Sequence, residues 1–270
     1  MYDSEWSRSR YWFCHFLYSR HDREPIAWSD AAARPSRLSV PLRRWLDGRH
    51  DPGHSGLWLI EQAVRDCGHD PAYVQSLRLL VKEQHYHREL LDRLVILTGG
   101  GQPAPVRSRR RSTLRRWCGH IGRSWLGARF EMSVRLLADL LDVTLMTLVE
   151  RSGPDAAVGG VCRNIINDKR AHIMFATERL TMLYADFNFI RRNVRRLRLR
   201  LMWAILLAAT IARHRRLIRA CGSTRARFLV GSMRQFNGIL ERMVPYRRDA
   251  LLSSLLNQRQ DPYAKPWDCV

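Results

Sequence analysis

Closely spaced cysteine pairs of the CxxC type are absent from this sequence. Its six cysteines are spread along the chain, at Cys14, Cys67, Cys118, Cys162, Cys221 and Cys269. Zinc knuckles and small disulfide-stabilised domains both need clustered cysteines, so neither class fits this pattern. We expect free thiols in a reducing compartment, which favours a cytoplasmic location.

Long apolar runs are also missing. The longest late run, LMWAILLAATIA at residues 201–212, has twelve residues, whereas a helix that spans a bilayer needs about 20. The aromatic run YWFCHFLY at residues 11–18 is short and lacks a small-residue cleavage site, so we do not expect a signal peptide. Because arginine clusters flank residues 201–212, this segment could pack on the rest of the chain, form a homo-oligomer contact or lie peripherally on a membrane.

Acidic residues and lysines are scarce relative to arginine. The chain has 46 Lys and Arg residues against 25 Asp and Glu, for a formal net charge of +21, and its only lysines are Lys82, Lys169 and Lys265. The simplest interpretation is a solvated basic surface, but such a charge also attracts an anionic membrane, an acidic protein or nucleic acid. No nucleic-acid-binding module accompanies the basic run RSRRR at residues 107–111, so sequence-specific nucleic-acid binding is not expected.

Helical periodicity is present along most of the sequence, and strand patterns are almost absent. The chain has 270 residues, of which 46% are hydrophobic, so it can bury a large core. Apolar residues and a histidine recur at steps of three, four and seven between Leu77 and Leu94, which is the pattern of one helix face. Further helices are predicted at residues 57–67, 128–151 and 156–187, with two more, the first of them basic, towards the C-terminus.

These elements divide the chain into four parts. The sequence predicts an irregular aromatic lead at 1–40, a four-helix bundle at 41–190, basic helices at 191–250 that pack on the bundle or form an interface, and a tail at 251–270. Two helical hairpins joined by a long connector, here a basic segment from residue 99 to about 112, indicate a bundle with one long crossover. The expected fold class is all-α.

Two motifs carry a resemblance to a known superfamily. KEQHYHRELLDRL at 82–94 and NDKRAHIMFATERL at 167–180 resemble the second and fourth helices of the ferritin-like di-iron carboxylate superfamily. The lead at 19–44 is similar to that of some bacterial ferritin-like domain proteins, and the resemblance covers roughly residues 10–240. It implies a ferritin-like four-helix bundle, two irons and a metal-dependent oxidoreductase activity. In this superfamily the second and fourth helices each carry Glu-x-x-His, and the first and third each add a glutamate.

The match to the family's ligands is incomplete. His87 and His172 correspond to the two family histidines. Three residues before them stand Gln84 and Lys169, where the family has glutamates. A lysine at a ligand position repels a cation, so two irons are not expected.

Other carboxylates lie near these positions. Glu83 and Asp168 each lie four residues before one of the histidines, on the same side of a helix. Mirroring the second hairpin about Pro154 brings Asp139 of the third helix level with the fourth-helix motif, although aspartate is one methylene shorter than the family's glutamate. Glu61 of the first helix would lie about two turns away from this level.

Three interpretations remain at this stage. The chain is expected to be a divergent ferritin-like protein with weak or no di-iron binding, in which Lys169 pairs with Asp139 and an ammonium group replaces a metal. Alternatively, it is an oxidoreductase with a single metal, for which iron is the candidate, in a shifted two-His-one-carboxylate site. The ligands would be His87, His172 and Asp139, with help from Glu83 or Asp168. A third alternative is a binding or scaffold protein that uses its Arg-rich C-terminal helix to contact an anionic membrane, an acidic partner or nucleic acid.

Overall fold

The computed structural model describes residues 2–19, 23–28, 40–42, 45, 54–68, 70–97, 113–153, 155–185 and 187–245. Within these ranges the regular structure is helical, without strands, so the prediction of an all-α fold is confirmed for them. The helices are α1 (Tyr2–Tyr18), α3 (His54–Cys67), α4 (Pro71–Val95), α5 (Thr113–Arg151), α6 (Ala156–Tyr184), α7 (Phe189–Ala220) and α8 (Arg225–Met243). The predicted connector at 99–112 and tail at 251–270 lie outside the described residues.

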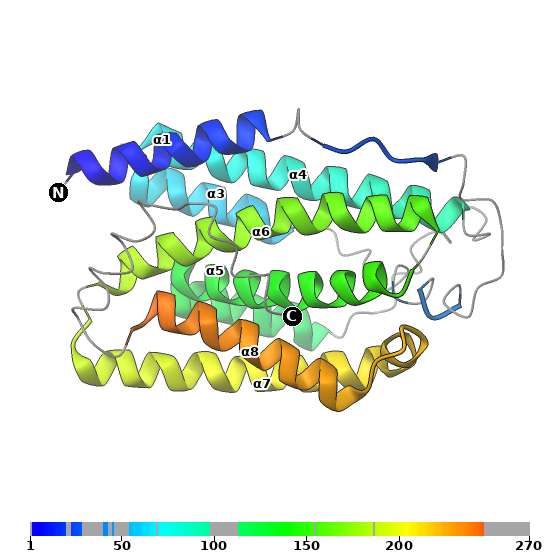
Figure 1. Ribbon diagram of the computed structural model, residues 1–270. Helices are drawn as coiled ribbons and strands as arrows, with labels where there is room; N and C mark the ends of the chain where they lie inside the picture. Colours follow the sequence, from blue (N-terminus) through cyan, green and yellow to red (C-terminus); the bar gives the residue numbers. More distant parts are fainter. Residues whose placement is uncertain are drawn as a thin grey trace.

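Helices α3, α4, α5 and α6 contact one another in a closed circuit, in which α3 packs on α4 and α5, and α6 packs on α4 and α5 (Figure 1). Short turns join α3 to α4 and α5 to α6, so both hairpins are antiparallel. Helices α4 and α6 are antiparallel as well, because the earlier residue Glu83 bonds the later His172, and His87 bonds Asp168. The part of α5 that follows Gly127 therefore runs in the same direction as α4.

Local sequence signals set the helix boundaries. Asp70 caps α4, where its side chain accepts a hydrogen bond from the backbone of Tyr73 at 3.1 Å and Pro71 occupies the first helical position. Asp155 caps α6 in the same way, accepting from Val158 at 2.8 Å. Helix α5 is interrupted at Gly127, whose φ of 67° lies in the left-handed region that favours glycine. The predicted start of the third helix at residue 128 coincides with this break.

The prediction that residues 1–40 are irregular is wrong for the segment that forms α1. This helix packs on α4. Its Trp12 and Phe16 are buried at a four-residue step, and the Trp12 indole Nε1 donates to the Glu178 carboxylate of α6 at 2.7 Å. The first part of the aromatic lead is therefore a helix that packs on α4 and hydrogen-bonds to α6.

Helices α7 and α8 pack on α5 and α6, on the side of the molecule away from α1 (Figure 1). The apolar segment 201–212 is the middle of the longer helix α7. Its Trp203 is buried and stacks on Phe236 of α8, with ring centroids 4.9 Å apart. None of the described helices has an apolar stretch long enough to cross a bilayer.

Candidate functional site

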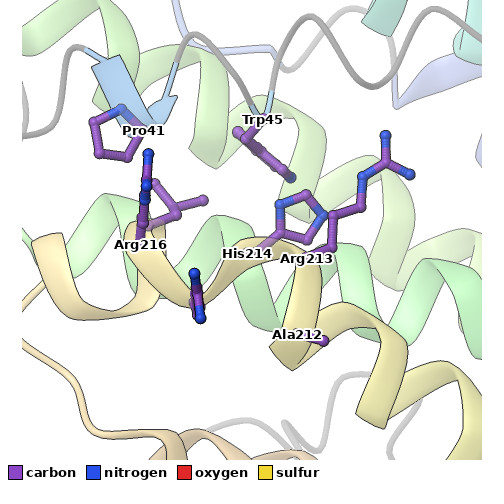
Figure 2. Close-up of a pocket in the computed structure, with 8 residues that line it drawn as sticks. Pro41, Trp45, Ala212, Arg213, His214 and Arg216 are labelled. Carbon is purple, nitrogen blue, oxygen red and sulfur yellow. The ribbon is translucent and has the colours of Figure 1, made fainter.

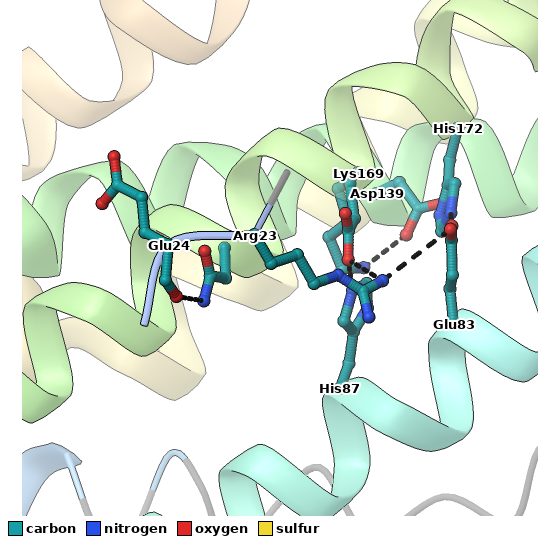
Figure 3. A network of polar contacts seen from close by, with 9 residues as sticks. Arg23, Glu24, Glu83, His87, Asp139, Lys169 and His172 are labelled. Carbon is teal, nitrogen blue, oxygen red and sulfur yellow. Dashed lines mark hydrogen bonds and ion pairs between the residues drawn. The ribbon is translucent and has the colours of Figure 1, made fainter. Parts of the chain in front are cut away.

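The two histidines that the sequence singled out meet inside the helical bundle (Figure 3). His87 of α4 and His172 of α6 have ring centroids 6.0 Å apart, and only 5% and 1% of their surfaces are exposed. Phe16 of α1 packs edge-on against the His172 ring, with centroids 5.8 Å apart. The two imidazoles come from separate hairpins and lie next to each other in the core.

Two reciprocal histidine–carboxylate pairs connect α4 with α6. His87 Nε2 lies 2.8 Å from Asp168 Oδ2, and His172 Nε2 lies 2.6 Å from Glu83 Oε2. Each helix contributes one histidine and one carboxylate four residues apart, a spacing that places both on the same face. Because each histidine pairs with the carboxylate of the other helix, the four side chains fix the register of the two helices.

An arginine from outside the helices also enters this polar core (Figure 3). Arg23 Nη2 lies 2.8 Å from Asp168 Oδ2 and 3.8 Å from Glu83 Oε1, and its guanidinium carbon lies 4.1 Å from the centre of the Tyr86 ring. The segment that carries Arg23 is held on α6 because Asn164 donates a hydrogen bond to the Glu24 carbonyl at 3.0 Å. The sequence pattern did not single out Arg23, since this segment has no helical period.

A lysine connects α6 with α5 next to the histidines (Figure 3). Lys169 Nζ donates to a carboxylate oxygen of Asp139 and, at 2.7 Å, to Asp142 Oδ2. Lys169 and Asp139 are buried, whereas 26% of the Asp142 side chain is exposed. The predicted pair of Lys169 with Asp139 is confirmed. Asp142 was missed, although its position three residues after Asp139 on α5 is the signal that could have found it.

The surrounding cations favour the ionised forms of the two buried aspartates. Burial alone would raise the pKa of Asp139, but the charges of Lys169, His172 and Arg135 and the Lys169 hydrogen bond hold it below its ordinary value. Burial likewise opposes ionisation of Asp168, and the His87 hydrogen bond together with Arg23 lowers its pKa. Both groups are therefore carboxylates that accept hydrogen bonds at neutral pH.

For His87, burial is the largest influence on the pKa. Desolvation lowers the pKa of His87 below 6.5, although the hydrogen bond and charge of Asp168 act in the other direction. His87 is therefore neutral at pH 7, and its Nε2–H donates to the Asp168 carboxylate. His15 of α1, which interacts electrostatically with the same carboxylates, also has a pKa lowered mainly by burial.

The side chains present do not fit a di-iron centre. The three carboxylates predicted as metal ligands each lie within ion-pair distance of a side-chain cation: Asp168 and Glu83 of Arg23, and Asp139 of Lys169. A divalent ion at these oxygens would lie next to a positively charged side chain, and the ion and that side chain would repel each other. Within the described part of the chain, no group of three or more His, Cys, Asp and Glu side chains is placed to hold a metal ion.

The assignment of His87, His172, Asp139, Glu83 and Asp168 as ligands of a single iron stays a prediction. Glu61 is exposed on α3, which agrees with its expected position away from the site. His85 and Glu89 are exposed too, so the polar face of α4 is separate from the buried motif.

No family model, curated protein or solved structure matches this chain.

The neutral state of His87 predicts a pH dependence of stability. As the pH falls through about 6.5, a histidine in the unfolded chain takes up a proton that folded His87 does not, so the free energy of unfolding decreases. We expect His87→Asn to reduce this acid-side slope in urea denaturation followed by circular dichroism between about pH 7.5 and about pH 5.5. The matched control is His85→Asn, which alters an exposed histidine two residues away and should keep the slope of the unmodified chain. An unchanged slope in His87→Asn would show that His87 is not held neutral.

Proposed function

We propose that this protein is a divergent ferritin-like bundle in which side-chain cations have taken the place of metal ions, and that it acts by binding rather than by catalysis. Three features support the ferritin-like relationship. Helix α4 and the part of α5 after Gly127 run in the same direction and belong to two antiparallel hairpins, as in ferritin-like folds. His87 and His172 lie on α4 and α6, which correspond to the second and fourth helices of that fold. Carboxylates accompany both histidines.

The observation that carries the metal-free proposal is the position of Lys169. In the ferritin-like pattern, the residue three positions before His172 is a glutamate that binds metal. Here that residue is Lys169, whose ammonium group bonds two aspartates of α5. Arg23 pairs with Asp168 of α6 and lies 3.8 Å from Glu83 of α4 in the same core. Buried carboxylates need a compensating positive charge, and in this chain arginine and lysine supply it.

This arrangement also bears on the oxidoreductase alternative. A metal that activates dioxygen needs ligands that compensate its charge and coordination positions that remain open. To reach Asp139 or Asp168, a divalent ion would first have to displace Lys169 or Arg23 from a buried ion pair. Removing one partner of such a pair costs about 3 to 5 kcal/mol, so the ion pairs compete directly with metal binding.

Metal analysis of the purified protein tests this proposal. The unmodified chain is incubated anaerobically with ferrous iron, desalted and analysed by inductively coupled plasma mass spectrometry. We expect less than stoichiometric iron, zinc and manganese, and the same low content in a His87→Ala/His172→Ala variant. Stoichiometric iron that disappears in this variant would overturn the proposal and support the metal-dependent enzyme instead.

A further inference from the structure

We propose that the outer face of α7 docks the protein on an anionic membrane surface. The proposal names a partner for the binding role proposed above and rests on that role. The evidence for it comes from α7 and not from the buried histidine core. Helix α7 lies at the outer edge of the structure, on the side away from α1 and α4 (Figure 1). Lipid binding and metal content can therefore be measured independently of each other.

A continuous apolar stripe follows the exposed side of α7. Its members and their exposed fractions are Ile190 (71%), Val194 (44%), Leu197 (58%), Leu201 (55%) and Ile205 (69%). They recur at steps of three and four residues, which keeps them on one helix face, and the exposed Ala208 and Ala212 continue the series. The opposite face of the helix, with Leu199, Trp203 and Leu207, is buried against the bundle.

Arginines border this stripe, and α7 contains no acidic residue. The exposed arginines of the helix are Arg191, Arg198, Arg200, Arg213, Arg215, Arg216 and Arg219. By contrast, the buried Arg192 and Arg196 attach α7 to its neighbours: Arg192 donates to the Ala185 carbonyl at 2.9 Å, and Arg196 pairs with Glu241 of α8. The arginines of α7 therefore form an inner set that fixes the helix and an outer set that faces solvent.

A basic pocket adjoins the C-terminal end of the stripe, where the backbone of α7 leaves the helical conformation at His214 (Figure 2). The pocket has a volume of about 420 Å³ and is lined by Pro41, Trp45 and residues 212–217. Three of the lining side chains are arginines, whose guanidinium groups suit the oxygens of a phosphate. Ala212 belongs to both the stripe and the pocket lining, so an acyl-chain contact and a phosphate contact would be adjacent.

The charge distribution favours a membrane over a second copy of the chain. Two copies that met through this stripe would bring their exposed arginines together, and α7 has no carboxylate to compensate them. An anionic lipid surface complements both features, because interfacial helices bury an apolar face among the acyl chains while arginines contact the headgroups. Each arginine near such a surface strengthens binding about fivefold at moderate ionic strength.

Vesicle sedimentation with the full-length protein tests the proposal. Vesicles of phosphatidylcholine and phosphatidylserine in equal parts are compared with vesicles of phosphatidylcholine alone, at low and at high salt. We expect partitioning onto the anionic vesicles that is about tenfold or more stronger than onto the neutral ones and that weakens at high salt. Leu201→Asp/Ile205→Asp should reduce this partitioning about tenfold or more, and Arg198→Gln/Arg200→Gln about fivefold per residue.

The matched control is Val64→Asp/Ile96→Asp, which makes the same charge change at two exposed apolar positions on or next to α3 and α4. It should bind vesicles nearly as well as the unmodified chain, and circular dichroism checks the fold of every variant. No binding of the unmodified chain, or equal losses in both Asp variants, would overturn the proposal. Sedimentation velocity without lipid provides a further test: a dimer that only Leu201→Asp/Ile205→Asp dissociates would assign the stripe to self-association instead.

Discussion

Lys169→Met is expected to lower the free energy of unfolding by about 3 to 5 kcal/mol. The substitution keeps most of the side-chain volume but leaves the buried Asp139 without the ammonium group that compensates it. Asp142 loses the same partner, although its partial exposure lets water replace part of the interaction. For a chain of this size the change corresponds to a decrease in melting temperature on the order of 10 °C. Urea denaturation and thermal melting at pH 7 measure both quantities.

Two further variants separate this effect from a general effect of removing a lysine. Lys82→Met alters an exposed lysine on α4 and should change stability by less than about 0.5 kcal/mol. Lys169→Met/Asp139→Leu removes both buried charges and should recover much of the lost stability, because a well-packed apolar pair can replace a buried ion pair. If Lys169→Met were as harmless as Lys82→Met, Lys169 would not be the cation that compensates the core.

Gln84→Glu/Lys169→Glu is expected to convert the core into a metal-binding site. The double substitution removes the lysine and places glutamates three residues before His87 and His172, which is the spacing of the ferritin-like ligands. Asp139 and Asp142 then lack a lysine partner, so the core holds an excess of negative charge that a divalent cation can compensate. Titration with Co²⁺ or anaerobic Fe²⁺, followed by absorption spectroscopy and metal analysis, should give stoichiometric binding.

Histidine substitutions inside and outside the core serve as controls for this gain of metal binding. Adding His87→Ala and His172→Ala to the double variant should abolish binding, whereas His85→Ala, at an exposed position on α4, should not. Lys169→Met alone should bind metal more weakly than the double variant, because it supplies no new ligand. A folded double variant that binds no metal would contradict the proposal that this core descends from a metal site.

Much of the core was predictable because helix periodicity and sequence spacing are local properties. The leucine pattern around Leu80 and Leu94 fixes which face of α4 is buried, and that face necessarily contains His87. Counting equal numbers of residues on either side of the short turn after α5 places Asp139 opposite Lys169. This works because two antiparallel helices with the same rise per residue keep their register. The pairing of the two hairpins through His87 and His172 followed from the similarity of their motifs.

Features that depend on long-range packing were not accessible from the sequence. Arg23 reaches Asp168 across 145 positions from a segment without periodicity, so no local pattern indicates the contact. In helix α1 the buried residues Trp12 and Phe16 follow a helical spacing. Exposed aromatic residues such as Tyr11 and Tyr18 are mixed with them in the sequence, so an apolar face and a polar face cannot be told apart from the pattern. The cross-pairing of Glu83 with His172, rather than with His87 on its own helix, depends on the relative rotation of α4 and α6.

Anomalous X-ray diffraction from crystals soaked in Mn²⁺ or grown anaerobically with Fe²⁺ tests the central claim most directly. Data collected at the metal absorption edge locate any ion independently of the protein atoms. We predict no anomalous peak between His87 and His172, with Lys169 Nζ in contact with Asp139 and Asp142 and with Arg23 in contact with Asp168. A peak bound by both histidines, with Lys169 or Arg23 displaced from its carboxylates, would contradict the claim that side-chain cations hold the place of the metal.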